Sequence, residues 1–425
     1  MRASAARGKN TRSAAVAPSS DRAVKVRVRE TPIRVPGFRF AGVACGIKGG
    51  GKLDLALMHS DVPATVAAMF TRNRVKAAPV VIAARHTRRG RAQAVLINSG
   101  NANACTGAAG ARVAIAACRQ TSIALGISPY DVIPCSTGKI GVLLPAVPMV
   151  RGIAAAVRAL DARGLWRAAH AMRTTDAFPK VAVRRVRVGG RAVTIAGLAK
   201  GAGMIAPDLA TLLVCALTDA RVAAPVLRRL VREAVATSFN AITVDGDMST
   251  NDTVVALANG AAGNTPFAVA SADGRRFGAA LTAVMRTLAD MVVADGEGAT
   301  KCVRIEVTGA ATVAAARRVA RSVAESQLVK TALYGGDPNW GRIVCAAGYA
   351  GVALAPERLR VAIAGIPVLR RGEPAPDAAV RRAAGAMRRV SFTVSIDLGS
   401  GRATATVTTS DLTPAYVRFN SAYST

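Results

Sequence analysis

The chain alternates between short apolar runs rich in β-branched residues and longer segments in which apolar residues recur every three or four positions. The short runs predict strands, because branched side chains suit a pleated, buried surface. They cover residues 93–98, 192–198, 253–258, 303–307, 361–366, 390–398 and 403–408. The longer spacing is that of one helix face. It predicts helices at 108–126, 150–172, 226–235 and 281–292.

Strands and helices are mixed along the whole length. This mixture predicts an α/β (α+β layered) fold, a sandwich in which helices cover sheets. A chain of 425 residues is long enough for two domains or for one large layered body. No run approaches the roughly 18 consecutive apolar residues that a membrane-spanning helix needs, so we do not expect this chain to be a membrane protein.

Several segments without periodicity are dense in Gly, Asn, Asp, Ser and Thr. Loops that gather small polar groups on flexible backbone often build functional sites, although any one of them could be a tight turn. Five such loops in one chain indicate a site. They are residues 98–107, 136–138, 200–207, 245–252 and 335–341.

The formal net charge is +32, from 57 Lys plus Arg against 25 Asp plus Glu. A charge of this size suggests a polyanionic partner such as nucleic acid. However, Arg supplies 47 of the 57 cations and is dispersed along the chain, and aromatic residues, at 4%, do not interleave with basic runs as base-stacking platforms would. We therefore interpret the charge as a composition bias and expect no nucleic-acid partner.

Seven scattered cysteines form no CxxC pair, which favours a reducing compartment over a disulfide framework or a zinc site. The expected location is the cytoplasm. Residues 1–30 are basic, rich in Ser and Ala, and lack an apolar signal-peptide core, so we expect a disordered extension. Their composition leaves the mitochondrial matrix as the alternative location.

The three histidines do not suggest a catalytic triad or a metal site. His59 lies in an expected polar turn, His86 in an Arg-rich stretch and His170 on an expected helix. Residues 46–52 match the spacing of a phosphate-binding loop, but Leu53 has no hydroxyl for magnesium. Residues 245–251 resemble the start of a calcium loop, but the twelfth position is Ala256 instead of Glu. We expect a flexible turn and an Asx-rich turn beside a site.

The remaining candidate mechanism is nucleophilic catalysis by a hydroxyl group that does not need a histidine as its base. A Thr can act as a nucleophile when cleavage of the chain before it frees its α-amino group, which titrates near ~8 and can serve as the base. The Gly-rich loop that begins at Lys200 leads into Ala210-Thr211 and then into an apolar, strand-like run. Strain in such a loop would favour attack by Thr211 on the preceding carbonyl. Taken alone, this signal is weak, because many threonines begin strands.

Eight sequence blocks, in order, resemble the ornithine acetyltransferases of arginine biosynthesis, the bifunctional glutamate N-acetyltransferases. The resemblance extends from about Pro36 to Thr425. The blocks are NSGNANACTG (98–107), STG (136–138), TTD (174–176), KGAGMIAPDLATLL (200–213), TVDGDMSTNDT (243–253), DGEGATK (295–301), LVKTALYGGDPNWGR (328–342) and NSAYST (420–425).

This resemblance implies self-cleavage between Ala210 and Thr211. Residues 31–210 would belong to an α subunit and residues 211–425 to a β subunit, with both halves in one body. Thr211 would take the acetyl group from N-acetylornithine and pass it to glutamate in a ping-pong reaction. The resemblance also implies a heterotetramer of two α and two β chains. No cofactor or metal is expected, and acetyl-CoA is a candidate co-substrate.

The same resemblance assigns roles to further residues. Thr137 and Gly138 would form the oxyanion hole. Lys200 would bind the substrate α-carboxylate, and Glu297 the side-chain ammonium of ornithine. The rest of the substrate pocket would come from Thr174 or Thr175, Asn420 and Thr425.

Two positions depart from the family pattern: Lys139 stands where an apolar residue is expected, and Met248 replaces a usual Thr. Neither change removes a group assigned to chemistry.

Two alternative functions stay open. One is a self-processed Thr-dependent amidohydrolase or aminopeptidase, in which water is the acceptor. The other is a basic nucleic-acid-binding protein.

Overall fold

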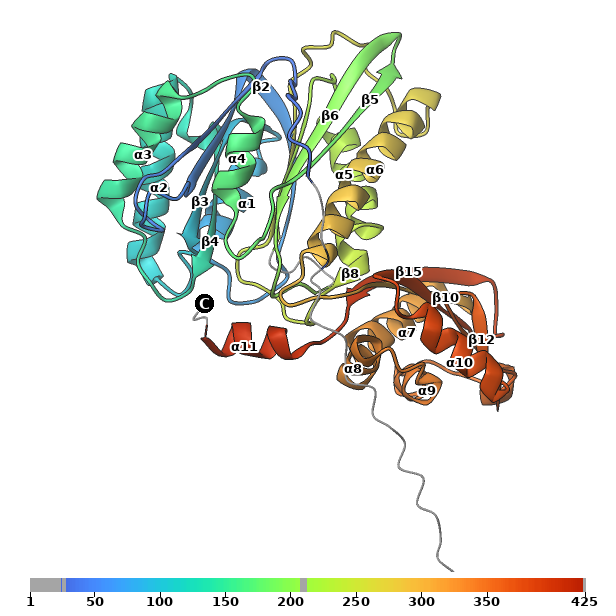
Figure 1. The fold of residues 1–425 in the computed structure, drawn as a ribbon. Coiled ribbons are helices and arrows are strands. Elements are labelled where there is room, and N and C mark those ends of the chain that lie inside the picture. The colour runs from blue at the N-terminus through green and yellow to red at the C-terminus, as the bar shows by residue number, and fades with distance from the viewer. Residues whose placement is uncertain (1–23, 25–27, 207–211, 423–425) are drawn as a thin grey trace, which may run out of the picture.

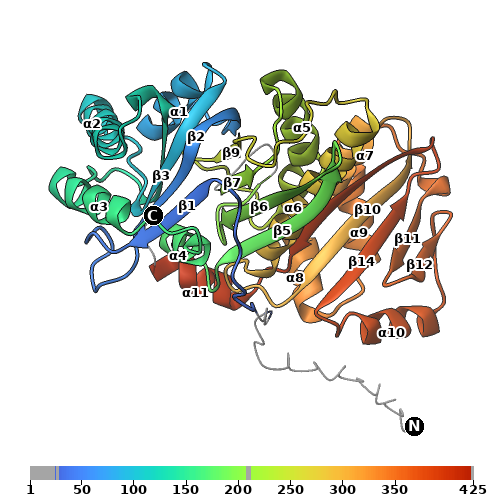
Figure 2. The ribbon, with the colours of Figure 1, turned by 90° about the horizontal axis from the view of Figure 1, so that it is seen from above.

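The computed structural model describes residue 24, residues 28–206 and residues 212–422. Within these residues the chain forms two β-sheets, each packed against helices (Figures 1 and 2). The expectation of a layered α/β body is confirmed. The first sheet and its helices make up the larger part of the molecule, and the second sheet lies beside it (Figure 2).

The first sheet has eight strands in the order β4-β3-β2-β9-β7-β6-β5, with β1 paired to the first part of β2. The pairs β3–β4 and β7–β9 are parallel and the others are antiparallel. The strands are β1 (Phe38–Val43), β2 (Leu55–Phe70), β3 (Arg91–Asn101), β4 (Val132–Lys139), β5 (Lys180–Val188), β6 (Arg191–Lys200), β7 (Leu213–Thr218) and β9 (Thr253–Ala258).

Helices cover both faces of this sheet. On one face, α5 and α6 pack against alternate residues of the central strands, including Val214 and Ala216. On the other face, α4 packs against the residues between them, such as Leu213 and Cys215. A strand that is buried on both faces does not alternate apolar and polar residues, which explains the continuous apolar run that follows Thr253 in β9. The helices are α1 (Ala78–Thr87), α2 (Gly107–Leu125), α3 (Ala146–Arg158), α4 (Leu165–Met172), α5 (Ala224–Ala236) and α6 (Ala272–Ala294).

The second sheet has the strand order β13-β12-β11-β14-β10-β15-β8. Its own apolar core lies against α7 (Val313–Glu325), α8 (Gln327–Gly335), α9 (Trp340–Gly348) and α10 (Asp377–Ala386). The strands are β8 (Ile242–Thr243), β10 (Cys302–Ala310), β11 (Arg360–Ile363), β12 (Ile366–Arg370), β13 (Glu373–Pro374), β14 (Ser391–Asp397) and β15 (Ala403–Ser410). The C-terminal helix α11 (Pro414–Ala422) returns from β15 beneath the first sheet (Figure 1).

Two predicted elements are each divided in the structure. The helix expected over 150–172 is wrong, because the chain leaves α3 to pair Asp161 with Phe40 of β1 before α4 begins. Gly164 permits this approach, since a Cβ there would lie 2.2 Å from the carbonyl oxygen of Phe40. The strand expected over 361–366 is a hairpin, which turns through Ala364 and Gly365 with φ values of 51° and 79°.

The environment of His59 also differs from the prediction. It lies within the 16-residue strand β2, only 5% exposed, and not in a polar turn. The apolar pattern does not predict this strand, because it is interrupted by His59, Ser60, Asp61 and Pro63. At this point the pairing of β2 with β3 is irregular. His170 lies on helix α4, as expected, and His86 lies on helix α1.

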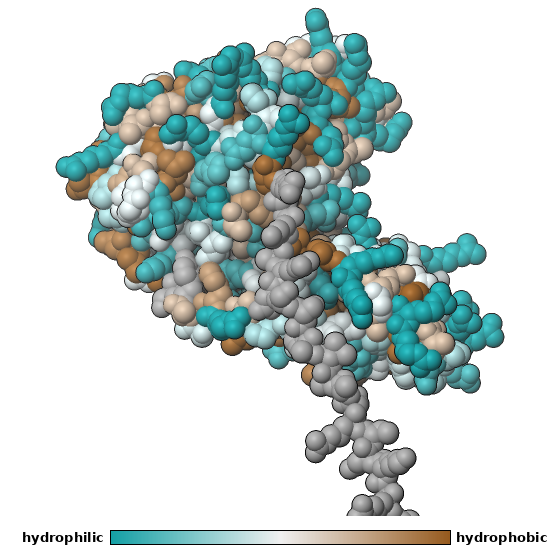
Figure 3. Space-filling model, in the orientation of Figure 1, coloured by the Kyte–Doolittle hydropathy of each residue, from teal (hydrophilic) through white to brown (hydrophobic). Residues whose placement is uncertain are grey.

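Helix α6 is long and apolar enough to cross a membrane by length and composition alone. Its apolar face is instead buried against the first sheet, with Phe277, Val284, Leu288 and Val292 in the core. Hydrophilic side chains project from both parts of the molecule on the face shown in Figure 3. All seven cysteines are free.

Candidate active site

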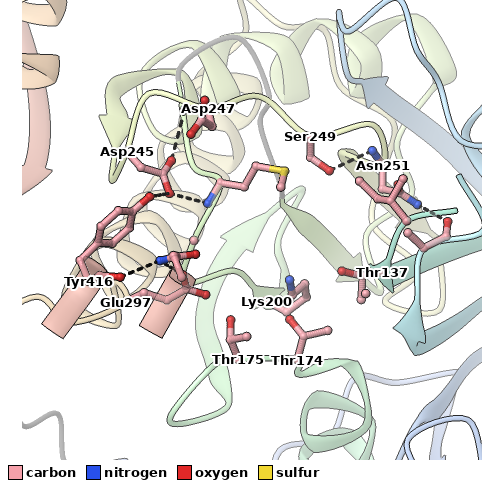
Figure 4. A pocket seen from close by; sticks show the side chains of 16 residues that line it. Thr137, Thr174, Thr175, Lys200, Asp245, Asp247, Ser249, Asn251, Glu297 and Tyr416 are labelled. Atoms are coloured by element: carbon pink, nitrogen blue, oxygen red, sulfur yellow. Dashed lines mark hydrogen bonds between the residues drawn. The ribbon is translucent and has the colours of Figure 1, made fainter. Parts of the chain in front are cut away.

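A pocket opens where the ends of β4 and β6 meet the loop before β9, the loop after α6, and helix α11 (Figure 4). Segments far apart in the sequence therefore supply its walls. The lining residues are Ala102, Thr137, Gly138, Ile140, Thr174, Thr175, Lys200, Gly203, Met204, Asp245, Asp247, Ser249, Asn251, Glu297, Tyr416 and Asn420.

Thr137 and Gly138 lie near the end of strand β4, at an irregularity in its pairing with β3, and this pair is called the Thr137–Gly138 turn, or oxyanion turn, below. Gly138 has φ +133°, and a Cβ there would lie 2.2 Å from the carbonyl carbon of Gly100 on β3, so only glycine fits. The amide of Asn251 holds this turn by donating to the carbonyl oxygens of Ser136 at 2.8 Å and Ala102 at 2.7 Å. The turn thus offers a hydroxyl and a backbone N–H in a fixed arrangement, as stabilising an oxyanion requires.

Lys200 ends β6 and is 3% exposed. Burial lowers the pKa of its ammonium, and the negative charge of Asp176 opposes this shift. Among the described residues, none forms an ion pair or hydrogen bond with its Nζ atom. Because a buried cation without a hydrogen-bonded partner is costly, its presence in the lining of a pocket indicates a site for an anionic group.

A buried ion-pair network ties the loops around Lys200 together. Lys180, fully buried, donates to Asp176 at 2.7 Å and to Asp295 at 2.6 Å. Asp176 also accepts hydrogen bonds from the backbone N–H groups of Thr174 at 3.0 Å and Gly201 at 2.6 Å. The network therefore fixes the Thr174 loop, the end of β6 and the loop that carries Glu297 relative to one another.

Burial and the two lysines act in opposite directions on the carboxyl groups of this network. Burial alone raises the pKa of Asp176, but Lys180 and Lys200 hold it well below the usual range. Asp295 has less support, so burial raises its pKa to about 6 despite Lys180. Asp176 therefore stays ionised at neutral pH, as its position between two lysines requires.

The opposite wall of the pocket is acidic. Burial raises the pKa of Asp245 to about 6, and its carboxylate accepts hydrogen bonds from the backbone N–H groups of Met204 at 2.6 Å and Ile205 at 2.8 Å. The N–H of Asp247 also donates to Asp245 at 3.2 Å, which is the hydrogen bond of the expected Asx turn, and both residues line the pocket. No cluster of metal-ligating side chains occurs in the part of the chain that the structure describes.

Helix α11 completes the acidic wall. The hydroxyl of Tyr416 donates to Asp245 at 3.3 Å, and the amide of Asn420 donates to Glu297 at 3.1 Å (Figure 4). Gly298 lets the helix approach, because a Cβ there would lie 2.5 Å from the backbone nitrogen of Tyr416. The C-terminal segment is thus a structural component of the pocket.

Ala210, Thr211 and Thr425 lie outside the described residues. The described chain resumes at Leu212, whose N–H donates to Asp252 at 2.7 Å. Leu213 then pairs with Lys200 on one side and with Thr253 on the other. The residue that follows Thr211 in the sequence is therefore fixed at the strand end that carries Lys200.

The structure brings together every predicted site residue that it describes. Thr137, Gly138, Thr174, Thr175, Lys200, Glu297 and Asn420 all line this pocket. The pocket is also lined by four residues that the sequence analysis did not name as site residues: Asp245, Asp247, Ser249 and Asn251. They belong to the polar loop 245–252, one of the five loops that indicated a site. Tyr416 had no sequence signal, because only the packing of α11 brings it to the pocket.

Comparison with known proteins gives a consistent result. A model of the ArgJ family matches residues 39–425. The arginine biosynthesis bifunctional protein ArgJ of Geobacter sulfurreducens is 48% identical over 393 residues, which cover 92% of this chain and 100% of the relative. The protein of the same name from Symbiobacterium thermophilum is 48% identical over 392 residues, covering 92% and 97%.

Among solved structures, the ornithine acetyltransferase of Mycobacterium tuberculosis complexed with ornithine is 41% identical. The match covers 42% of this chain and 94% of that chain, with a TM-score of 0.37. The family model spans most of the sequence, and the two relatives are similar over almost their whole lengths. The chain belongs to the ArgJ family.

Proposed function

We propose that this chain is an acetyltransferase of arginine biosynthesis, which moves an acetyl group from N-acetylornithine to glutamate through an acetyl-Thr211 intermediate. The two relatives are named as arginine biosynthesis proteins. The observation that carries the proposal is the polarity of the pocket. A buried Lys200 without a hydrogen-bonded partner faces a wall of carboxylates that includes Glu297, and Thr137 lies on the other side of Lys200 (Figure 4).

This polarity suits the donor. N-acetylornithine carries an α-carboxylate at one end and a side-chain ammonium at the other. Lys200 would pair with the carboxylate, while Glu297 and Asp245 would pair with the ammonium. Thr174 and Thr175 line the pocket beside Lys200 and have hydroxyls that can donate to the substrate. The donor would therefore be held at both ends, with the acetyl group on its α-nitrogen close to the carboxylate that Lys200 binds.

The chemistry would begin with cleavage between Ala210 and Thr211, which divides the chain into parts of 210 and 215 residues. The freed α-amine of Thr211 then takes the proton from its own Oγ as Oγ attacks the acetyl carbonyl carbon. Thr137 and the N–H of Gly138 would stabilise the resulting oxyanion. Collapse breaks the C–N bond, and the leaving nitrogen of ornithine takes the proton from the α-ammonium.

The second half of the reaction would reverse these steps with another amine. The α-amine of glutamate attacks the acetyl ester and Thr211 Oγ leaves, which regenerates the enzyme and releases N-acetylglutamate. Donor and acceptor thus use the nucleophile in turn, which is the pattern of ping-pong kinetics. We extend the proposal to a cytoplasmic assembly of two α and two β chains.

The proposal is tested by intact-mass analysis together with an acetyl-transfer assay. Purified protein should give two fragments that meet at Ala210–Thr211, and it should form N-acetylglutamate from N-acetylornithine and glutamate. Thr211→Ala should stay as one chain and lose transfer by roughly 10⁴-fold or more. Thr211→Ser keeps a hydroxyl and should retain cleavage. An uncut chain with full activity would overturn the proposal, and release of acetate in preference to transfer would favour an amidohydrolase.

A further inference from the structure

A second pocket is lined by Lys139, the residue after Gly138, and by Gly100 on the neighbouring strand, and it shares Thr174 with the candidate active site. Its charged side chains are cationic: Lys48, Lys52, Lys139 and Arg173 line it together with His170, and no carboxylate does. The side chains of Lys52 and Lys139 are exposed, whereas Lys48 and Arg173 are half-buried. This pocket therefore has the opposite charge to the acidic wall of the candidate active site.

Lys48 and Arg173 are held in place without being neutralised at short range. The ammonium of Lys48 donates to the carbonyl oxygens of Leu53 at 2.9 Å and Arg173 at 2.5 Å, which leaves its third N–H for a ligand. The guanidinium of Arg173 donates to the carbonyl oxygens of Asp176 and Ala177. Among the described residues, neither cation forms an ion pair with a carboxylate.

Asp54 is the acidic group nearest to Lys48, and its carboxylate is already occupied. It accepts the backbone N–H groups of Cys45, Gly46, Ile47 and Lys48, at 2.7 to 3.1 Å. The glycine-rich segment that resembles a phosphate-binding loop is thus folded around an internal carboxylate. Asp54 shapes the loop that presents Lys48 and attracts its ammonium, while burial lowers the pKa of Lys48 to about 8.

Backbone contacts place Lys48 beside the oxyanion turn. Gly100 has φ +98°, and a Cβ there would lie 2.8 Å from Cγ of Lys48. Gly100 is in turn the register partner of Gly138 on the neighbouring strand. Neighbouring strands lie about 4.8 Å apart, so Lys48, Gly100 and Gly138 form a short stack from the cationic pocket to the oxyanion turn.

The two pockets together address a requirement of the proposed ping-pong reaction. Donor and acceptor have side chains of opposite charge, because ornithine ends in an ammonium and glutamate in a carboxylate. The wall formed by Asp245, Asp247 and Glu297 suits the first and repels the second. The acceptor side chain therefore needs a cationic site within reach of the same acetyl group.

We propose that the pocket formed by Lys48, Lys139 and Arg173 binds the γ-carboxylate of the acceptor glutamate while its α-amine attacks the acetyl ester. This inference rests on the proposed function and adds a separate acceptor subsite to it. Glutamate enters beside Thr174 with its side chain directed behind the oxyanion turn. The ornithine side chain uses the acidic wall.

The test separates the two half-reactions in Lys48→Met and Lys139→Met. Ornithine release in a single turnover of N-acetylornithine, without acceptor, should equal that of the wild type in both. The kcat/KM for glutamate should fall about 10- to 100-fold in Lys48→Met and about 3- to 10-fold in the more exposed Lys139→Met. Lys76→Met is the matched control, because Lys76 also donates to a backbone carbonyl but lines neither pocket. It should change neither half-reaction.

The preference for glutamate over glutamine as the acceptor gives a second measurement. A purely structural role of Lys48 would leave this preference unchanged. The wild type should prefer glutamate, and Lys48→Met should lose most of this preference, since glutamine has the same shape without the charge. An unchanged preference in both variants would overturn the inference. So would a parallel loss of both half-reactions in the exposed Lys139→Met, or a loss confined to acetyl-CoA as donor. Absence of transfer in the wild type would instead overturn the proposed function.

Discussion

The two walls of the candidate active site differ in charge and in how they are held. The wall around Lys200 is built on strand ends and is fixed from behind by the buried Lys180 network. The wall around Asp245 and Glu297 is built from loops and is closed by the C-terminal helix, through single hydrogen bonds from Tyr416 and Asn420.

This difference suits two different roles for the two walls. The strand-end wall holds the groups whose positions the proposed chemistry restricts to a fraction of an ångström, namely the Thr137–Gly138 turn and Leu212, which follows the proposed nucleophile in the sequence. The loop-and-helix wall holds the groups that recognise the far end of the substrate, where longer-range charge is sufficient. Changes to the first wall should therefore be costly, and changes to the second milder and dependent on pH.

The largest expected effect is on the support of the strand-end wall. Lys180→Met leaves Asp176 and Asp295 buried without their cation, so the free energy of unfolding should fall by about 3–5 kcal/mol. Urea denaturation measures this change. Arg229→Met is the control, because it removes an exposed ion pair with Glu233 and should have little effect. Equal stability of the two variants would contradict a supporting role for the network.

The next effect concerns the oxyanion turn itself. In the proposed mechanism Thr137 donates only as the oxyanion forms, so in Thr137→Ala the kcat should fall about 10²- to 10³-fold with little change in KM. Thr137→Ser keeps the hydroxyl and should recover most of the rate. Steady-state kinetics with N-acetylornithine distinguish the two outcomes. A rise in KM at unchanged kcat would instead assign Thr137 to substrate binding.

Lys200→Met should have a smaller effect that appears in a different parameter. Loss of the ammonium leaves the substrate α-carboxylate without its partner, and kcat/KM for N-acetylornithine should fall about 10- to 100-fold, mainly through KM. The same variant removes a buried charge that has no hydrogen-bonded partner among the described residues, so its melting temperature should change little. A large loss of stability would show that Lys200 has a structural partner.

The smallest effect is expected on the loop-and-helix wall. The pKa of Asp245, at about 6, is above its usual range, so this side chain gains its negative charge as the pH rises through 6. Binding of the cationic donor should strengthen over the same interval. In Asp245→Asn this rise in kcat/KM should shrink, leaving the part that Asp295 contributes, while kcat changes less than tenfold. An identical pH profile would exclude Asp245 from donor recognition.

The fold was predictable where burial is uniform along an element. The expected strand at 253–258 has the same bounds as β9, because both of its faces are covered and no polar residue interrupts it. Prediction failed where tertiary contacts interrupt or override the pattern. The pairing of Asp161 with Phe40 divides one expected helix, and polar residues near His59 conceal the continuous strand β2.

For the site, sequence resemblance identified residues whose motifs are long, such as Lys200 and Glu297, and the structure brings them together. It gave no reason to select Tyr416, whose place depends on the approach of α11 to Gly298. The sequence resemblance also gave no indication of the cationic pocket. A loop interpreted as a flexible turn proved to be ordered around Asp54, and this order presents Lys48.

The central claim, that Thr211 carries the acetyl group, is tested most directly by trapping the intermediate. The enzyme would be mixed with N-acetylornithine without glutamate, quenched with acid, digested and analysed by mass spectrometry. We predict one added acetyl group on the peptide that begins with Thr211, and its loss when glutamate is added before the quench. An acetyl group on any other residue, or transfer to glutamate with Thr211 never acetylated, would contradict this account.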